Sequence, residues 1–190
     1  MQALFTLDGF TDVEPAPVVR EIAFIVMDAF RNPDKPRPAG EVILGEMMRQ
    51  CVHTHHKSVV RSTADLTVSF LGRCWTRVSY TATPQAREHF LATMEGLLNA
   101  FVAQAEDRGN NTIRSVESYF ELRRETIGMG PSYFIGELHL SIPDEAYYHP
   151  VVRELECLAA DMIAMDNVRS SSSSPFARCS LTAAAGHRVV

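Results

Sequence analysis

A long amphipathic helix pattern follows Thr83 and Pro84. Threonine before proline is a typical helix start, because the threonine caps free backbone N–H groups and proline fits the first helical position. Apolar side chains then recur three and four residues apart, as on one face of a helix. They are Phe90, Met94, Leu97 and Phe101, with Leu91, Leu98 and Val102 beside them. A stripe this wide predicts one long helix, the longest of the chain.

Shorter helix patterns lie on both sides of this stripe. They predict helices near residues 3–12, 18–32, 39–50, 116–124, 133–140 and 150–167. The last contains an apolar series at alternating four- and three-residue intervals: Val151, Leu155, Leu158, Met162 and Met165. Since no strand-turn-strand pattern competes with these helices, we predict an all-α domain over residues 1–167.

Two stretches differ from this helical texture. Residues 51–73 are rich in β-branched residues and serine, and we expect them to form an inserted loop. Residues 168–190 contain five consecutive serines and few apolar residues, so we expect a disordered tail. Each stretch begins beside a valine, Val52 or Val168, and every valine codon starts with the bases GT that open most introns. One hypothesis is that both stretches are translated introns.

The charge and cysteine content exclude several classes of protein. A net charge of −5 provides no basic surface for nucleic acid, and no apolar run reaches the length of a membrane span. The four cysteines form no Cys-x-x-Cys pair, and the N-terminus has no secretory signal pattern. These features predict a cytoplasmic protein with reduced thiols. A zinc cluster of His53, His55 and His56 is a weaker alternative, because the three residues lack standard ligand spacing.

Two carboxylates, Asp8 and Asp12, lie four residues apart in the first helix pattern, so they share one helix face. One or two carboxylates suffice to hold Mg²⁺ when the phosphate oxygens of a substrate complete its shell. An acidic pair at this spacing is also common on ordinary surfaces, and the spacing alone leaves both interpretations open.

The run from Asp8 to Pro15 resembles the first aspartate-rich motif of class I terpene synthases, specifically the fungal, basidiomycete-type sesquiterpene synthases. Gly9 departs from the motif, which has an acid or amide at its second position. The resemblance implies a partial α-helical barrel or bundle that lacks helices at both ends. It also implies that Asp8 and Asp12 bind metal and take part in catalysis.

Two later segments extend the resemblance. Arg124 and Gly128 match an Arg-x-x-x-Gly element whose arginine contacts the substrate diphosphate, although an arginine near a helix end is often only a solvated charge. Asn167 matches the first position of the second metal motif, and Ser171 has the spacing of its serine. Val168 and Pro175 stand where that motif has acids, so this match is incomplete.

The resemblance implies Mg²⁺-dependent ionisation of farnesyl diphosphate and cyclisation of the resulting cation to a sesquiterpene. Aromatic faces stabilise positive charge, and candidates for that role are Phe5, Phe10, Tyr133 and Phe134, which could equally be core residues. The alternative function is a catalytically inactive, truncated or mis-spliced remnant that acts as a helical interaction module.

Overall fold

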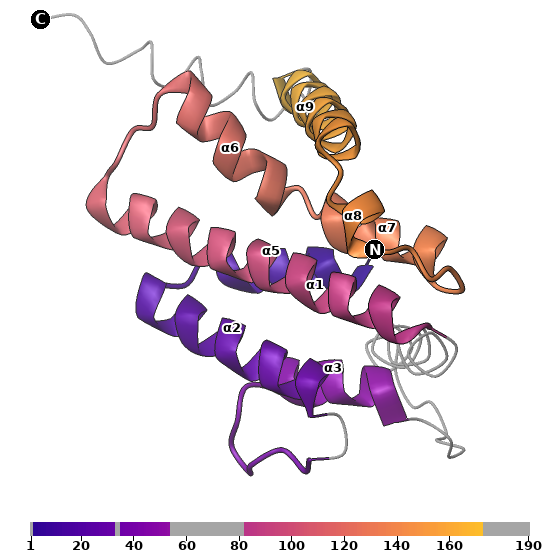
Figure 1. The fold of residues 1–190 in the computed structure, drawn as a ribbon. Coiled ribbons are helices and arrows are strands. Elements are labelled where there is room, and N and C mark those ends of the chain that lie inside the picture. The colour runs from indigo at the N-terminus through magenta and orange to yellow at the C-terminus, as the bar shows by residue number, and fades with distance from the viewer. Residues whose placement is uncertain (1, 33–34, 54–81, 173–190) are drawn as a thin grey trace, which may run out of the picture.

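The computed structural model describes residues 2–32, 35–53 and 82–172, and every regular element in these ranges is an α-helix (Figure 1). The helices are α1 (Gln2–Thr11), α2 (Ala16–Arg31), α3 (Ile43–His53), α5 (Pro84–Asn110), α6 (Val116–Thr126), α7 (Met129–Glu137), α8 (Asp144–Tyr147) and α9 (Pro150–Ser172). The predicted all-α class is confirmed. Within the described ranges, no helix is both long enough and apolar enough to cross a membrane.

The central helix is α5, with α2 along one side and α6 and α7 along the other (Figure 1). It begins as predicted, because the Thr83 side chain accepts a hydrogen bond from the backbone N of Ala86 at 3.2 Å. Phe90, Met94, Leu97 and Phe101 of its apolar stripe are buried, and on the side of α2 the Phe30 and Phe90 rings meet edge to face with centroids 5.4 Å apart. Burial of each large side chain contributes about 1.5–3 kcal/mol to the stability of the fold. The packing of α2 on α5 therefore dominates the core.

Ion pairs hold the segment between α2 and α3 in place. The Arg37 guanidinium donates to both oxygens of Glu41, at 2.6 and 2.5 Å, and to Asp28. Hydrogen bonds from Lys35 and Arg37 lower the pKa of Asp28 to about 2. The next helix, α3, continues to His53, so the first residues of the predicted insertion are helical; residues 54–73 lie outside the described part of the chain.

The helix after the Gly128 turn begins earlier than its sequence pattern predicts. We expected it to start near Tyr133, but α7 starts at Met129 and contains Gly130 and Pro131. Proline is compatible with a first turn, because the N–H groups there have no intrahelical partner. The single turn of α8 was not predicted from the sequence.

The last helix, α9, packs on α6 at the edge of the molecule (Figure 1). It extends to Ser172, so residues 168–172 are helical, in contrast to the predicted disordered tail, and residues 173–190 lie outside the described part. Serine has only a modest cost within a helix, and one more turn is therefore tolerated. The buried side of α9 carries Ala160 and Ala164, and the predicted apolar series lies on its exposed side, with Leu158 55% and Met162 73% exposed.

Candidate functional site

The two predicted carboxylates lie at the C-terminal end of α1. Asp8 is half-buried in the last turn, and Asp12 follows the helix and is exposed. The amide of Asp12 donates to the carbonyl O of Asp8 at 2.9 Å, so the two residues are one helical turn apart. Leu7, next to Asp8, has no exposed surface, which anchors this end of α1 in the core.

Arg108 of α5 holds the end of α1. Its Nη2 donates to the carbonyl O of Thr11 at 2.7 Å and to that of Glu14 at 3.4 Å. Carbonyl groups at the end of a helix lack intrahelical partners, and a guanidinium satisfies them well. The backbone that carries Asp8 and Asp12 is therefore attached to the end of α5.

Asp8 lines a cavity of about 90 Å³ formed by helices that are distant in the sequence. The other polar side chains around it are Arg123 and Thr126 from α6, Ser132 from α7 and Asn167 from α9. Its remaining lining residues are Leu4, Leu97, Phe101, Ile127 and Gly128. Three predicted site residues, one each from the first aspartate motif, the glycine turn and the second metal motif, thus border the same cavity.

The charges in this cavity favour two kinds of ligand. Burial raises the pKa of Asp8 above its ordinary value, the charge of Asp12 raises it further, and the Arg123 guanidinium acts in the opposite direction. A half-buried carboxylate with a like charge beside it is stabilised by a cation. A guanidinium on the same wall favours an anion. The site is therefore suited to an anion accompanied by a metal ion.

The turn between α6 and α7 brings backbone groups to the cavity. Gly128 has φ 73° and ψ 19°, a left-handed conformation that favours glycine. The amide of Ile127 donates to the carbonyl O of Arg123 at 3.0 Å, and the Ser132 hydroxyl donates to that of Gly128 at 2.7 Å. The predicted glycine-containing break is therefore a compact, hydrogen-bonded turn.

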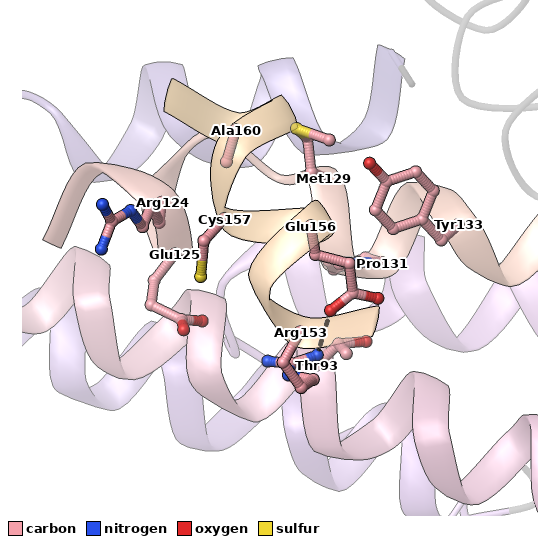
Figure 2. Close-up of a pocket in the computed structure, with 11 residues that line it drawn as sticks. Thr93, Arg124, Glu125, Met129, Pro131, Tyr133, Arg153, Glu156, Cys157 and Ala160 are labelled. Carbon is pink, nitrogen blue, oxygen red and sulfur yellow. Dashed lines mark hydrogen bonds and ion pairs between the residues drawn. The ribbon is translucent and has the colours of Figure 1, made fainter. Parts of the chain in front are cut away.

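Arg124 lies outside the cavity that Asp8 lines. Its Nε and Nη2 each donate to an oxygen of Asp161 on α9 at 2.8 Å, and this hydrogen bonding raises the pKa of Arg124 and lowers that of Asp161. Arg124 lines a different pocket, of about 60 Å³, between α5, α6, α7 and α9. Figure 2 shows Arg124 at one end of that pocket and Tyr133 at the other, with Glu156 and Cys157 between them.

Both residues that match the second metal motif, Asn167 and Ser171, belong to α9. Asn167 is exposed and is one of the residues that line the Asp8 cavity. Ser171 lies four residues further along, in the last turn of the same helix.

Phe10, Tyr133 and Phe134 are not among the described residues that line the Asp8 cavity. Phe134 is buried against Phe90 with ring centroids 4.7 Å apart, Phe10 and Tyr133 are each 41% exposed, and the Phe5 side chain lies outside the described part. The aromatic residue that lines the cavity is Phe101, which its sequence pattern places only in the core. The sequence also missed Arg123, Thr126 and Ser132.

The oxygen donors around Asp8 fit a hard cation. Across the described ranges, no group of three or more His, Cys, Asp or Glu side chains is placed to hold a metal ion. Asp8 and Asn167 provide oxygen atoms at one cavity, and Mg²⁺ needs few protein ligands because water and ligand oxygens complete its shell. For the zinc alternative, His53 ends α3, and His55 and His56 lie outside the described residues.

Comparison with known proteins supports the same relationship. The family model described as terpene synthase family 2, C-terminal metal binding, matches residues 1–171. The chain is 45% identical to Sesquiterpene synthase 14 of Postia placenta over 167 residues, which are 88% of this chain and 41% of that protein. It is 40% identical to Delta(6)-protoilludene synthase of Armillaria ostoyae over 88% of this chain and 42% of that protein. This chain therefore spans about two fifths of these curated relatives, and it belongs to the terpene synthase family.

Proposed function

We propose that this chain provides the diphosphate-binding site of a sesquiterpene synthase that ionises farnesyl diphosphate with Mg²⁺ and cyclises the resulting allylic cation. The observation that carries the proposal is the shared cavity of Asp8, Gly128 and Asn167. These residues come from three separate segments, and each belongs to a different motif of the family resemblance. The class of product that we propose, a sesquiterpene, is taken from the names of the relatives.

We assign the metal ligands to Asp8, Asp12, Asn167 and Ser171. Bound Mg²⁺ would stabilise the negative charge that develops on the diphosphate as it leaves. Asp8 and Asp12 supply the negative charge that attracts the cations, and their attachment to α5 through Arg108 keeps them in place.

Arg124 and Gly128 form the substrate-sensing element of the proposal. Gly128 allows the chain to turn sharply beside the cavity, so that backbone groups approach the diphosphate closely. Arg124 takes the sensor role in the family resemblance, and it can do so only when its guanidinium leaves Asp161.

The apolar side of the cavity must keep water from the allylic cation. Leu4, Leu97 and Phe101 provide that surface next to Asp8. A volume of about 90 Å³ corresponds to roughly three water molecules, so these residues surround a head group rather than a fifteen-carbon chain. We therefore propose that further residues of the whole protein contribute to the hydrocarbon pocket.

The test is to incubate the purified chain with farnesyl diphosphate and Mg²⁺, to analyse volatile products by gas chromatography, and to measure substrate binding by calorimetry. We expect sesquiterpene product and Mg²⁺-dependent binding. Asp8→Asn should reduce product by about 100-fold or more, because it removes a ligand of the metal that stabilises the leaving group. Glu21→Gln, which changes an exposed carboxylate on α2, is the matched control and should have no effect.

Two results would contradict the proposal. Binding without product would show that this chain does not ionise the substrate. Absence of both binding and product from a folded chain would favour the inactive helical remnant.

A further inference from the structure

Two consecutive arginines of α6, Arg123 and Arg124, have different surroundings. Successive residues of an α-helix are rotated by about 100°, so the two side chains leave α6 in different directions. Arg123 reaches the cavity of Asp8 and Asn167, and Arg124 reaches Asp161 and the pocket in Figure 2. This difference determines which guanidinium is available to an anion.

Arg124 already has an anionic partner. Both of its contacts with Asp161 are 2.8 Å long and involve two different nitrogens, which is the bidentate geometry that guanidinium groups form with carboxylates. This ion pair joins α6 to α9, the helix that carries Asn167. An anion that recruits Arg124 must compete with Asp161, and α6 and α9 lose a connection when it does.

Arg123 has no such competitor. In the described part of the chain it forms no ion pair, and its Nη1 donates to the neutral Thr126 Oγ1 at 3.3 Å. Among the described residues that line the cavity, Arg123 alone is cationic. An anion that enters beside Asp8 therefore meets Arg123 first.

Hydrogen bonds also connect Arg123 to the Gly128 turn. Its carbonyl O accepts hydrogen bonds from the amide of Ile127 at 3.0 Å and from the Thr126 hydroxyl at 3.4 Å. Thr126 is buried, so these contacts tie Arg123 to the Gly128 turn. The guanidinium itself is held by its own hydrogen bond to Thr126 Oγ1. Held there, it loses less side-chain freedom when it binds a ligand than a fully mobile side chain does.

We propose that Arg123 is a further substrate-binding residue of this protein and holds the diphosphate group in the Asp8 cavity for as long as Arg124 is paired with Asp161. The identity of the anion rests on the function proposed above. The division of roles between the two arginines rests on their contacts alone.

The experiment measures binding of inorganic diphosphate in the presence of Mg²⁺ to the full chain by calorimetry. Arg123→Gln should weaken binding by about 10- to 100-fold, the loss expected for one or two charged hydrogen bonds. Arg123→Lys should recover part of the loss, because it restores the charge but not the planar fork. Arg20→Gln changes an exposed arginine that pairs with Glu106, and this control should bind like the parent chain.

Arg124→Gln and Asp161→Asn separate the two roles. Both break the same ion pair, so both should lower the melting temperature, and each should weaken diphosphate binding less than Arg123→Gln does. Circular dichroism checks that each variant is folded. A larger loss in Arg124→Gln than in Arg123→Gln, or no binding of diphosphate by the parent chain, would overturn the proposal. Arg123-dependent binding without sesquiterpene product would instead contradict only the proposed function.

Discussion

Gly128 lines the Asp8 cavity in a left-handed backbone conformation. Its φ of 73° is favourable for glycine and costs other residues about 1–2 kcal/mol, and an added Cβ would also lie 3.4 Å from Leu4 Cδ1. We therefore expect Gly128→Ala to reduce the free energy of unfolding, measured in urea, by about 1–2 kcal/mol.

The control for this substitution is Gly109→Ala, in the last turn of α5. Gly109 has open space where a Cβ would be and is not among the positive-φ glycines, so this change should be neutral or stabilising by up to about 1 kcal/mol. Equal destabilisation by both substitutions would show that the left-handed turn is not the cause.

The two arginines show the limit of sequence interpretation for single residues. The family pattern identifies Arg124, which the structure pairs with Asp161, while its neighbour Arg123 lines the cavity. The direction in which each arginine side chain points depends on how α6 is rotated about its axis relative to α1 and α9. A sequence motif contains no information about those neighbouring helices. Asp8 and Asn167, which the family resemblance also identifies, do line one cavity, because α1 and α9 carry them to it from distant parts of the chain.

At the scale of the elements, His89 connects three helices. It lies on α5 and is 3% exposed; its Nδ1 hydrogen-bonds to Glu137 on α7, and its Nε2 lies 3.0 Å from Asp144 Oδ1 on α8. The Tyr147 ring stacks on it with centroids 3.7 Å apart. Because α8 leads into α9, this cluster fixes where the helix that carries Asn167 begins.

This connection predicts a dependence of stability on pH. Burial alone lowers the pKa of His89, but its hydrogen bonds to Glu137 and Asp144 outweigh that effect and raise the net pKa above its ordinary value. A raised histidine pKa stabilises the fold below about pH 6.5, and the stabilisation is lost as the pH rises through the folded-state value. The melting temperature should therefore fall as the pH rises above about 6.5, the ordinary pKa of histidine.

His89→Gln should remove most of this pH dependence, because glutamine does not titrate. His149→Gln changes an exposed histidine and should leave the dependence intact. Identical pH profiles for the parent chain and His89→Gln would contradict this role of His89.

The boundaries of the elements were predicted best where capping residues mark them. The Thr83-Pro84 start of α5 is an example, because both residues act locally. The start of α7 was predicted less well, since Gly130 and Pro131 are unfavourable in a helix interior but tolerated in its first turn. The apolar series of α9 indicated the helix correctly but not its buried side, because periodicity does not identify which neighbour is present.

At the scale of the whole molecule, the core and the exposed side of α9 should respond differently to the same substitution. Leu98 on α5 is 1% exposed, and Leu158 on α9 is 55% exposed. Leu98→Ala should reduce the free energy of unfolding by about 2–5 kcal/mol, because it leaves a cavity in the core. Leu158→Ala should change it by no more than about 0.5 kcal/mol.

Urea denaturation of both variants measures this difference. A contiguous exposed apolar surface also favours association, so Leu158→Ala should decrease light scattering at high concentration, whereas Leu98→Ala should not. A large loss of stability in Leu158→Ala would mean that the apolar series of α9 is buried in solution.

The Asp8 cavity has walls from α1, from the α6–α7 turn and from α9, and α1 and α9 lie at opposite ends of the described chain. A ligand bound there acts as a non-covalent cross-link between those ends, and its binding energy adds to the stability of every part that must separate before it can leave. Amide hydrogen exchange should consequently slow in α1 and α9 together when diphosphate and Mg²⁺ are added, although the two helices are far apart in the sequence.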